Sequence, residues 1–123
     1  MSTRVLVVED EVLVGMDLVM LLEDWGYLPD GPHASVKQAV EAIDTFEPEV
    51  AILDMNLGGG ESSMPISREL TARGIPFAFL TGYTRSDAFN DALMKNVPRM
   101  NKPVSEDELR STLRKLSEQV SAS

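Results

Sequence analysis

The chain has 123 residues, the size of one ordinary domain, and 43% of them are hydrophobic, which is enough for a buried core. Its 20 acidic residues outnumber 11 basic ones, so the formal net charge is −9. Because nucleic-acid phosphates and anionic membranes repel such a chain, we expect neither as a partner. The absence of cysteine excludes disulfides, thiolate metal sites and cysteine nucleophiles, and a single histidine excludes zinc sites with several histidines.

The sequence shows no targeting segment and no membrane-spanning segment. The apolar run at residues 5–8 is far shorter than the core of a signal peptide. The apolar stretch at 12–22 is interrupted by Gly15 and Asp17, and it is shorter than the roughly 20 residues that cross a bilayer. We therefore expect a soluble, cytoplasmic protein.

Apolar runs alternate with segments of helical periodicity along the chain. In chain order, the patterns predict a strand at 5–8, a helix at 11–25, a strand at 27–31, a helix at 36–46, a strand at 50–53, a helix at 66–72, a strand at 77–80, a helix at 86–94, a strand at 99–101 and a helix at 105–120. Three of the strand runs are apolar on both faces, which is typical of parallel strands covered by helices. Five such βα units indicate an α/β fold with a doubly wound parallel sheet.

Two of the predicted helices begin with a recognisable capping box. Ser35 with Gln38, and Ser105 with Glu108, have the spacing at which the two side chains can satisfy backbone N–H groups of a first helical turn. The helix at 11–25 is expected to stop at Gly26.

Polar residues stand where the predicted strands end. In chain order they are Glu9 and Asp10, Asp54, Thr81, and Lys102 with Pro103. Right-handed crossovers place the carboxyl ends of parallel strands at one edge of the sheet, which is where open α/β sheets bind ligands. We therefore expect these residues, far apart in sequence, to converge.

The residue types at this edge indicate a particular chemistry. Clustered carboxylates repel one another unless a cation neutralises them. Oxygen ligands without histidine or cysteine favour Mg²⁺. Lys102 offers a positive charge to a phosphoryl oxygen, and the Thr81 hydroxyl can donate to another. The combination predicts phosphoryl transfer to a carboxylate.

Four motifs, in this order, resemble those of the receiver domains of two-component response regulators: VLVVEDE, AILDMNL, FLTGY and NKP. They span nearly the whole chain. The resemblance implies a single receiver domain over residues 1–123, without an output domain, and a flavodoxin-like sheet with strand order 2-1-3-4-5. It implies a signalling protein that assists only its own phosphorylation and dephosphorylation, rather than an enzyme.

The resemblance also implies a role for each acidic residue. Asp54 would be the phosphoacceptor. Glu9 and Asp10 would be the acidic pair that organises Mg²⁺. Asp54 itself and the main-chain carbonyl of Asn56 would complete the protein ligands of the metal.

The remaining site residues follow from the same resemblance. Thr81 would be the switch hydroxyl that turns towards the phosphoryl group, and Lys102 would pair with that group. The peptide bond before Pro103 is expected to be cis, an arrangement that proline makes tolerable.

Two positions depart from the usual receiver pattern. Arg99 stands three residues before the lysine, where the family usually carries an aromatic residue, and the loop after Asp54 reads Gly58-Gly59-Gly60 in place of a common proline. Together with PFAFLTGY at 76–83, these departures resemble the FAT GUY subgroup, which occurs mostly as single domains in alphaproteobacteria and works with histidine kinases of the HWE or HisKA2 type. By that resemblance Tyr83 would be the mobile aromatic residue.

The implied function is a phosphoacceptor signalling module. A sensor histidine kinase would phosphorylate Asp54, and the surface around 86–94, the last strand and the last helix would change its affinity for a downstream protein, or the phosphoryl group would pass to a phosphotransfer protein. Two alternatives stay open. Arg99 leaves room for a pseudo-receiver that binds partners without phosphorylation. A haloacid-dehalogenase-like phosphatase would use Asp54 as nucleophile, but such enzymes carry a second acid where this chain has Asn56.

The helix expected at 11–25 is apolar around more of its circumference than one buried face requires. Either the helix is deeply buried, or it presents a surface to a partner protein or to a second copy in a weak homodimer.

Overall fold

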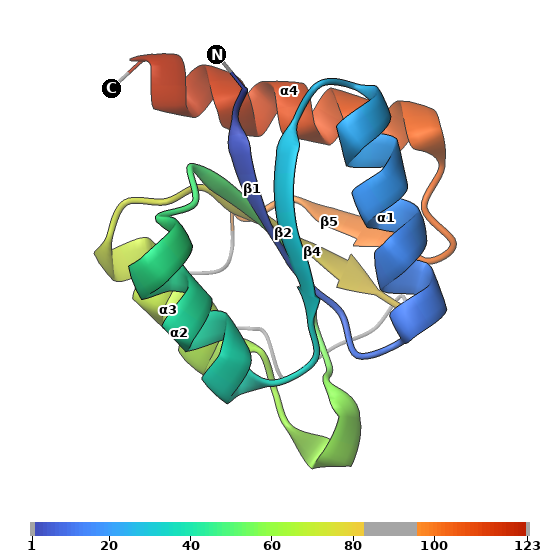
Figure 1. The fold of residues 1–123 in the computed structure, drawn as a ribbon, viewed down its shortest axis with the longest axis vertical. Coiled ribbons are helices and arrows are strands. Elements are labelled where there is room, and N and C mark those ends of the chain that lie inside the picture. The colour runs from blue at the N-terminus through green and yellow to red at the C-terminus, as the bar shows by residue number, and fades with distance from the viewer. Residues whose placement is uncertain (1, 83–95, 123) are drawn as a thin grey trace.

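The structure is a computed structural model that describes residues 2–82 and 96–122. Its elements are β1 (Arg4–Val8), α1 (Val12–Asp24), β2 (Leu28–His33), α2 (Val36–Phe46), β3 (Val50–Asp54), a short 3-10 turn η1 (Gly58–Gly60), α3 (Met64–Ala72), β4 (Phe77–Thr81), β5 (Arg99–Asn101) and α4 (Glu106–Ala122) (Figure 1). The predicted helix at 86–94 lies outside the described residues, so α4 here is the C-terminal helix.

The five strands form one parallel sheet in the order β2-β1-β3-β4-β5. This confirms the predicted doubly wound α/β fold and its strand order. The order reverses between β1 and β3, and at such a switch point the crossovers diverge and leave a crevice beyond the strand ends. All five residues of β3 and all five of β4 are buried, as the runs apolar on both faces predict.

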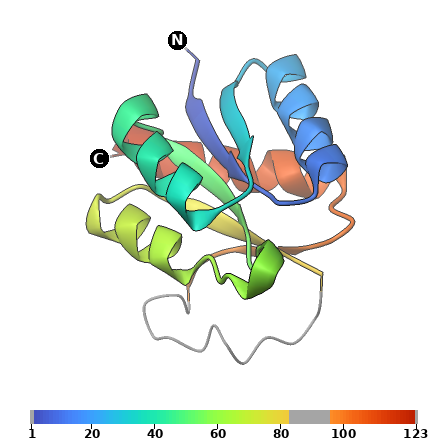
Figure 2. The ribbon, with the colours of Figure 1, turned by 60° about the horizontal axis from the view of Figure 1, so that its bottom comes forward.

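Helices cover both faces of the sheet (Figures 1 and 2). One core holds Ile43 of α2 and Leu70 of α3 against Leu6 and Phe79 of the sheet. The core on the opposite face is built from α1, α4 and the strand residues that point the other way, among them Val5, Val7, Leu18, Leu22, Ile52, Leu80, Leu109 and Leu113. Because side chains alternate along a strand, β1 supplies both cores from successive residues.

The two predicted capping residues do cap their helices. The Ser35 hydroxyl accepts a hydrogen bond from the Gln38 N–H at 3.2 Å, and the Ser105 hydroxyl accepts one from the Glu108 N–H at 3.1 Å. The Gln38 side chain reaches one residue further back than a capping box requires, to the N–H of Ala34 at 3.0 Å. Each cap satisfies a backbone donor that would otherwise lack a partner at the helix start.

The end of β2 approaches α1 very closely. A Cβ at Gly15 of α1 would lie 2.4 Å from Cβ of Pro32, so only glycine fits there. Gly31 has a φ of +139°, which favours glycine, and its peptide bond to Pro32 is cis. The sequence patterns end this strand at residue 31, whereas the structure extends it to His33.

None of the helices in the described residues combines the length and the hydropathy that spanning a bilayer requires.

Candidate functional site

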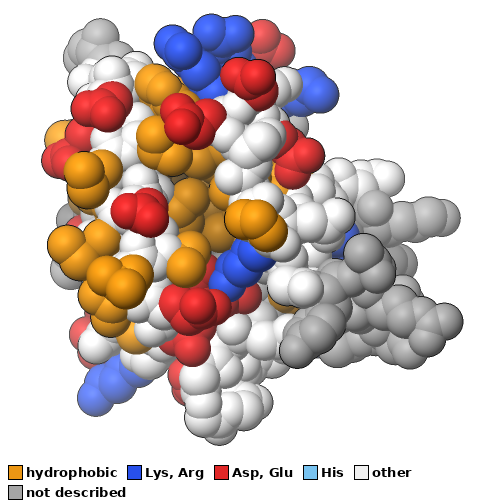
Figure 3. All heavy atoms as spheres, turned by 90° about the vertical axis from the view of Figure 1, so that its right-hand side faces the viewer, with side chains coloured by type: hydrophobic (Ala, Val, Ile, Leu, Met, Phe, Trp, Pro, Cys, Tyr) orange, Lys and Arg blue, Asp and Glu red, His pale blue; other side chains and the backbone are white. Residues whose placement is uncertain are grey.

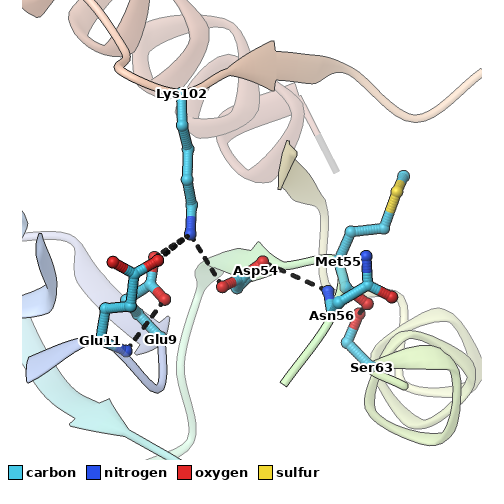
Figure 4. Close-up of polar contacts among 7 residues, drawn as sticks. All are labelled: Glu9, Glu11, Asp54, Met55, Asn56, Ser63 and Lys102. Carbon is cyan, nitrogen blue, oxygen red and sulfur yellow. Dashed lines mark hydrogen bonds and ion pairs between the residues drawn. The ribbon is translucent and has the colours of Figure 1, made fainter. Parts of the chain in front are cut away.

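The polar residues at the strand ends converge at the carboxyl edge of the sheet. Glu9 and Asp10 directly follow β1, Asp54 is the last residue of β3, and Lys102 directly follows β5. Figure 4 shows the Lys102 side chain reaching between the carboxylates from the β5 side. The spatial convergence expected from right-handed crossovers is therefore present.

The Lys102 ammonium lies among three carboxylates. Its Nζ is 2.7 Å from Oε1 of Glu9, 2.9 Å from Oδ2 of Asp54 and 3.5 Å from Oε1 of Glu11 (Figure 4). The first two acids are almost entirely buried, and the Lys102 side chain is only 18% exposed. Ion pairs in such a sheltered place are screened much less by salt than surface pairs are.

Burial and charge shift the pKa values of this cluster. Burial raises the pKa of Glu9 to about 7, with a further rise from neighbouring Asp54, while hydrogen bonds from Lys102 and from the Glu11 backbone oppose the rise. Burial alone would lower the pKa of Lys102, but hydrogen bonds to Glu9 and Asp54 raise it above the ordinary lysine value. The lysine therefore stays charged, and Glu9 holds a proton more readily than a solvated carboxyl group does.

Three acids are placed to share one cation. Glu9, Asp10 and Asp54 each offer a carboxylate oxygen, and these oxygens lie within 4.8 Å of one another. An all-oxygen set of hard ligands, open to solvent on the side of half-exposed Asp10, suits Mg²⁺, which keeps several waters. The residues present therefore fit the expected metal.

The loop after β3 is tied down next to the acceptor residue. The N–H of Asn56 donates to Oδ1 of Asp54 at 3.2 Å. The carbonyl of buried Met55 accepts from both the hydroxyl and the N–H of Ser63, at 3.1 and 3.3 Å (Figure 4). The side chain of Asp54 thus has fixed partners on both oxygens, Asn56 on one and Lys102 on the other.

The sequence patterns did not reveal two neighbours of the site. Gly58, at the start of η1, lies so close to Asp10 that a Cβ there would be 3.1 Å from Oδ2 of Asp10, so the glycine loop lies against the acidic cluster. The Glu11 side chain forms an ion pair with Lys102. The sequence gives a single sign of this third acid, the run Glu9-Asp10-Glu11. Both contacts depend on side-chain direction, which strand-end reasoning does not supply.

The residues expected to act as the switch are only partly described. Thr81 is buried at the end of β4, and its carbonyl accepts a hydrogen bond from the Lys102 N–H at 2.8 Å. The peptide bond between Lys102 and Pro103 is cis. Tyr83 lies outside the described residues. Arg99 is exposed at the start of β5.

A groove of about 730 Å³ runs between α1 and the segment that leads from β5 into α4. Its apolar lining includes Leu18, Leu21 and Leu80, and Lys102 lies at one end. Figure 3 looks onto this side of the molecule and shows hydrophobic side chains gathered beside the hollow. The charged residues that line the groove, apart from Lys102, are all acidic: Glu11, Asp17, Asp24 and Glu106.

The outer face of α1 is exposed rather than buried. Of the five large hydrophobic side chains that are exposed within the described residues, four lie on this helix: Val12, Leu13, Met16 and Met20. The Leu13 side chain is the extreme case at 79% exposed. The interpretation of α1 as a deeply buried helix is therefore wrong, and the extra apolar residues form a surface stripe.

The chain is similar to known proteins in sequence and in structure. A family model described as the response regulator receiver domain matches residues 5–114. The transcriptional regulatory protein PdtaR of Mycobacterium tuberculosis is 31% identical over 84 residues, which are 68% of this chain and 41% of PdtaR. The chain thus spans well under half the length of that curated relative.

Two solved structures extend the likeness to nearly the whole chain. SdrG of Sphingomonas melonis is 35% identical with a TM-score of 0.76, covering 97% of this chain and 96% of SdrG. The signal receiver domain of a modulated diguanylate cyclase from Desulfovibrio desulfuricans is 26% identical with a TM-score of 0.87, covering 99% and 98%. With the parallel sheet, the acidic cluster and the lysine at its carboxyl edge, these matches show that the chain belongs to the family of response regulator receiver domains.

Proposed function

We propose that this chain is a phosphoacceptor of a two-component system, and that a histidine kinase transfers a phosphoryl group to Asp54. One observation carries the proposal: Oδ2 of Asp54 lies 2.9 Å from Lys102 Nζ, in a pocket where Glu9 and Asp10 bring further oxygens within 4.8 Å. A carboxylate nucleophile, a cation site and a fixed ammonium are the parts that phosphoryl transfer to aspartate requires.

The chemistry follows from the placement of these groups. A carboxylate oxygen of Asp54 attacks phosphorus, the bond from phosphorus to the histidine nitrogen breaks, and an acyl phosphate forms with the histidine as leaving group. Glu9, Asp10 and Asp54, with the carbonyl of Asn56 as a further proposed ligand, would hold Mg²⁺, which would supply positive charge to the phosphoryl group. Lys102 binds a phosphoryl oxygen as a point charge, and the Thr81 hydroxyl donates to another.

The response to phosphorylation is proposed to spread from Thr81. Its hydroxyl turns towards the phosphoryl group, and Tyr83 follows it, as expected for a receiver of the FAT GUY subgroup. Arg99 supports this choice of aromatic residue, since it stands where receivers usually carry a ring, three residues before Lys102. The surface of β5 and α4, with the helix predicted at 86–94, would then change its affinity for a downstream protein, or the phosphoryl group would pass to a phosphotransfer protein.

The stripe on α1 and the adjoining groove are the proposed docking surface of the kinase, of HWE or HisKA2 type. The acidic rim favours a partner helix with an apolar face and basic flanks. Weak homodimerisation through the same stripe is the competing prediction, and it is opposed by like charges on the two rims.

Leu13→Ser is expected to weaken kinase binding about 10-fold by loss of a buried apolar anchor, without altering phosphorylation by a small donor.

The deciding experiment is intact mass after incubation with a small phosphodonor. The native chain is expected to gain one phosphoryl group, and only when Mg²⁺ is present. Asp54→Asn is expected to gain no phosphoryl group. Asp107→Asn, at an exposed acid at the start of α4, is the control and is expected to gain as much mass as the native chain. No gain in mass with the donor or with a histidine kinase would leave a phosphorylation-independent pseudo-receiver. Steady turnover of phosphomonoesters would instead favour the phosphatase alternative, which Asn56 in the place of a second acid disfavours.

A further inference from the structure

Glu11 is an acidic residue at the site that has no place in the proposed phosphoacceptor chemistry. It stands at the N-cap of α1, and its backbone N–H donates to Oε2 of Glu9 at 3.2 Å. Its own carboxylate turns back to Lys102, with Oε1 3.5 Å from Nζ (Figure 4). Whereas Glu9 and Asp54 are buried, the Glu11 side chain is 62% exposed.

The Lys102 ammonium already has a carboxylate partner for each of its three N–H donors before any phosphoryl group binds. A lysine ammonium has three N–H donors, and three carboxylates lie within 3.5 Å of Nζ. To bind a phosphoryl oxygen, the ammonium must release one of them.

The three carboxylates differ in how easily they can leave. Glu9 is enclosed and lies at 2.7 Å, and Asp54 is the residue to which the phosphoryl group is attached. Glu11 makes the longest contact, and its exposed carboxylate can rotate into water without losing solvation. Glu11 is therefore the partner that Lys102 can exchange at least cost.

We propose that Glu11 is a displaceable counter-ion of Lys102, which occupies the ammonium in the unphosphorylated protein and gives way to the phosphoryl group. This inference rests on the proposed phosphoacceptor function. Glu11 acts through Lys102 and is a positioning residue. Its charge also repels an incoming anion, so both effects make phosphoryl binding weaker than the remaining site residues would allow.

The test uses beryllofluoride, a tetrahedral stand-in for a phosphoryl group on a carboxylate, titrated in the presence of Mg²⁺ and followed by amide chemical shifts. Glu11→Gln, which keeps the shape and removes the charge, is expected to bind beryllofluoride about 2- to 5-fold more tightly than the native chain. The matched control is Glu23→Gln, at an exposed residue on the last turn of the same helix and outside the groove. The beryllofluoride affinity of Glu23→Gln is expected to lie within about 1.5-fold of that of the native chain.

A third variant separates the contact from the charge. Glu11→Asp keeps the negative charge but is one methylene shorter, so it loses reach to Lys102, and we expect an affinity between those of the native chain and Glu11→Gln. A merely structural role would change the denaturant midpoint of the metal-free protein instead, and that midpoint is expected to be the same in Glu11→Gln and Glu23→Gln as in the native chain.

Each other result has a defined meaning. Equal beryllofluoride affinity in Glu11→Gln and the native chain, or an equal gain in Glu23→Gln, overturns the inference and leaves the phosphoacceptor function intact. Weaker binding in Glu11→Gln also overturns it, because Glu11 would then support Lys102 in binding the anion. If the native chain itself does not bind beryllofluoride with Mg²⁺, the proposed function fails, and the inference fails with it.

Discussion

Burial of Glu9 links the stability of the metal-free protein to pH. Its pKa is raised to about 7 from 4.5, so between these values the folded protein binds this proton more tightly than the unfolded chain does. The stabilisation from this group is complete below the unfolded value and is lost as the pH rises through the folded value. Without metal, a pH above about 7 therefore leaves a buried negative charge, which Lys102 and the Glu11 N–H balance.

Removing that charge tests the linkage. In chelator, we expect Glu9→Gln to be about 1–3 kcal/mol more stable than the native chain at about pH 8, and nearly equal to it at about pH 4. Urea unfolding followed by the fluorescence of Trp25 measures the stability at both pH values, with Glu118→Gln, at an exposed residue of α4, as the control. Parallel pH profiles for the native chain and Glu9→Gln would contradict a raised pKa.

Single residues of the site were predictable to different degrees. Glu9, Asp54 and Lys102 could be found from the sequence, because each stands at the end of a strand or directly after it and the handedness of the crossovers fixes where strand ends meet. Glu11 could not be found in this way, since its contact with Lys102 depends on a side chain that turns back from the start of a helix. The proximity of Gly58 to Asp10 depends on a loop path that no periodicity encodes.

At the scale of elements, the contact between α1 and β2 requires a glycine. Gly15→Ala would place a methyl group 2.4 Å from Cβ and 2.7 Å from Cγ of Pro32, so the helix or the strand end must move. We expect a loss of about 1–3 kcal/mol in the free energy of unfolding, although alanine is intrinsically better than glycine in a helix by about 1 kcal/mol. Urea unfolding at fixed pH measures the change.

The control for this substitution is Glu23→Ala, on an exposed turn of the same helix, which is expected to change stability by no more than about 0.5 kcal/mol. A Gly15→Ala variant as stable as the native chain would show that the close approach of α1 to β2 relaxes at a cost no larger than the gain in helix propensity, about 1 kcal/mol.

Element boundaries were harder to predict than element types. The strand runs of β3 and β4 are apolar on both faces and could be placed within a residue or so. β2 contains Pro29 and Pro32, which argue against a strand, and it is tolerated because it lies at the edge of the sheet. α3 begins two residues earlier than its apolar pattern predicts, because Pro65 is well suited to the first turn of a helix.

For the whole molecule, metal binding should be visible as stability. A ligand that binds only the folded state stabilises it by RT ln(1 + [L]/Kd), about 2.7 kcal/mol at a hundredfold excess over Kd. We expect Mg²⁺ to raise the melting temperature of the native chain by several degrees and to leave Asp10→Asn nearly unchanged. Asp107→Asn should respond as the native chain does. An equal rise in Asp10→Asn would mean that the cation binds elsewhere.

The global topology was predictable because few arrangements of five βα units exist once the crossovers are right-handed. The extent to which α1 is buried was not predictable from the sequence. A helix apolar around most of its circumference is compatible with deep burial or with an exposed stripe, and only the packing of α4 and β2 beside it decides between them. That packing leaves Leu13, Met16 and Met20 in contact with solvent.

The crowding of Glu9, Glu11 and Asp54 around a single ammonium, with Asp10 beside Glu9 and Asp54, has a consequence for selectivity among phosphate compounds. Four carboxylates against one lysine leave this corner with a negative field, which draws cations in and drives free anions away. Free phosphate compounds are therefore repelled from the site. A donor that belongs to a docked partner protein is held at the site despite this repulsion. The same excess of acid is expected to make phosphorylation by a free donor slower than phosphorylation by a donor that a docked partner brings to the site.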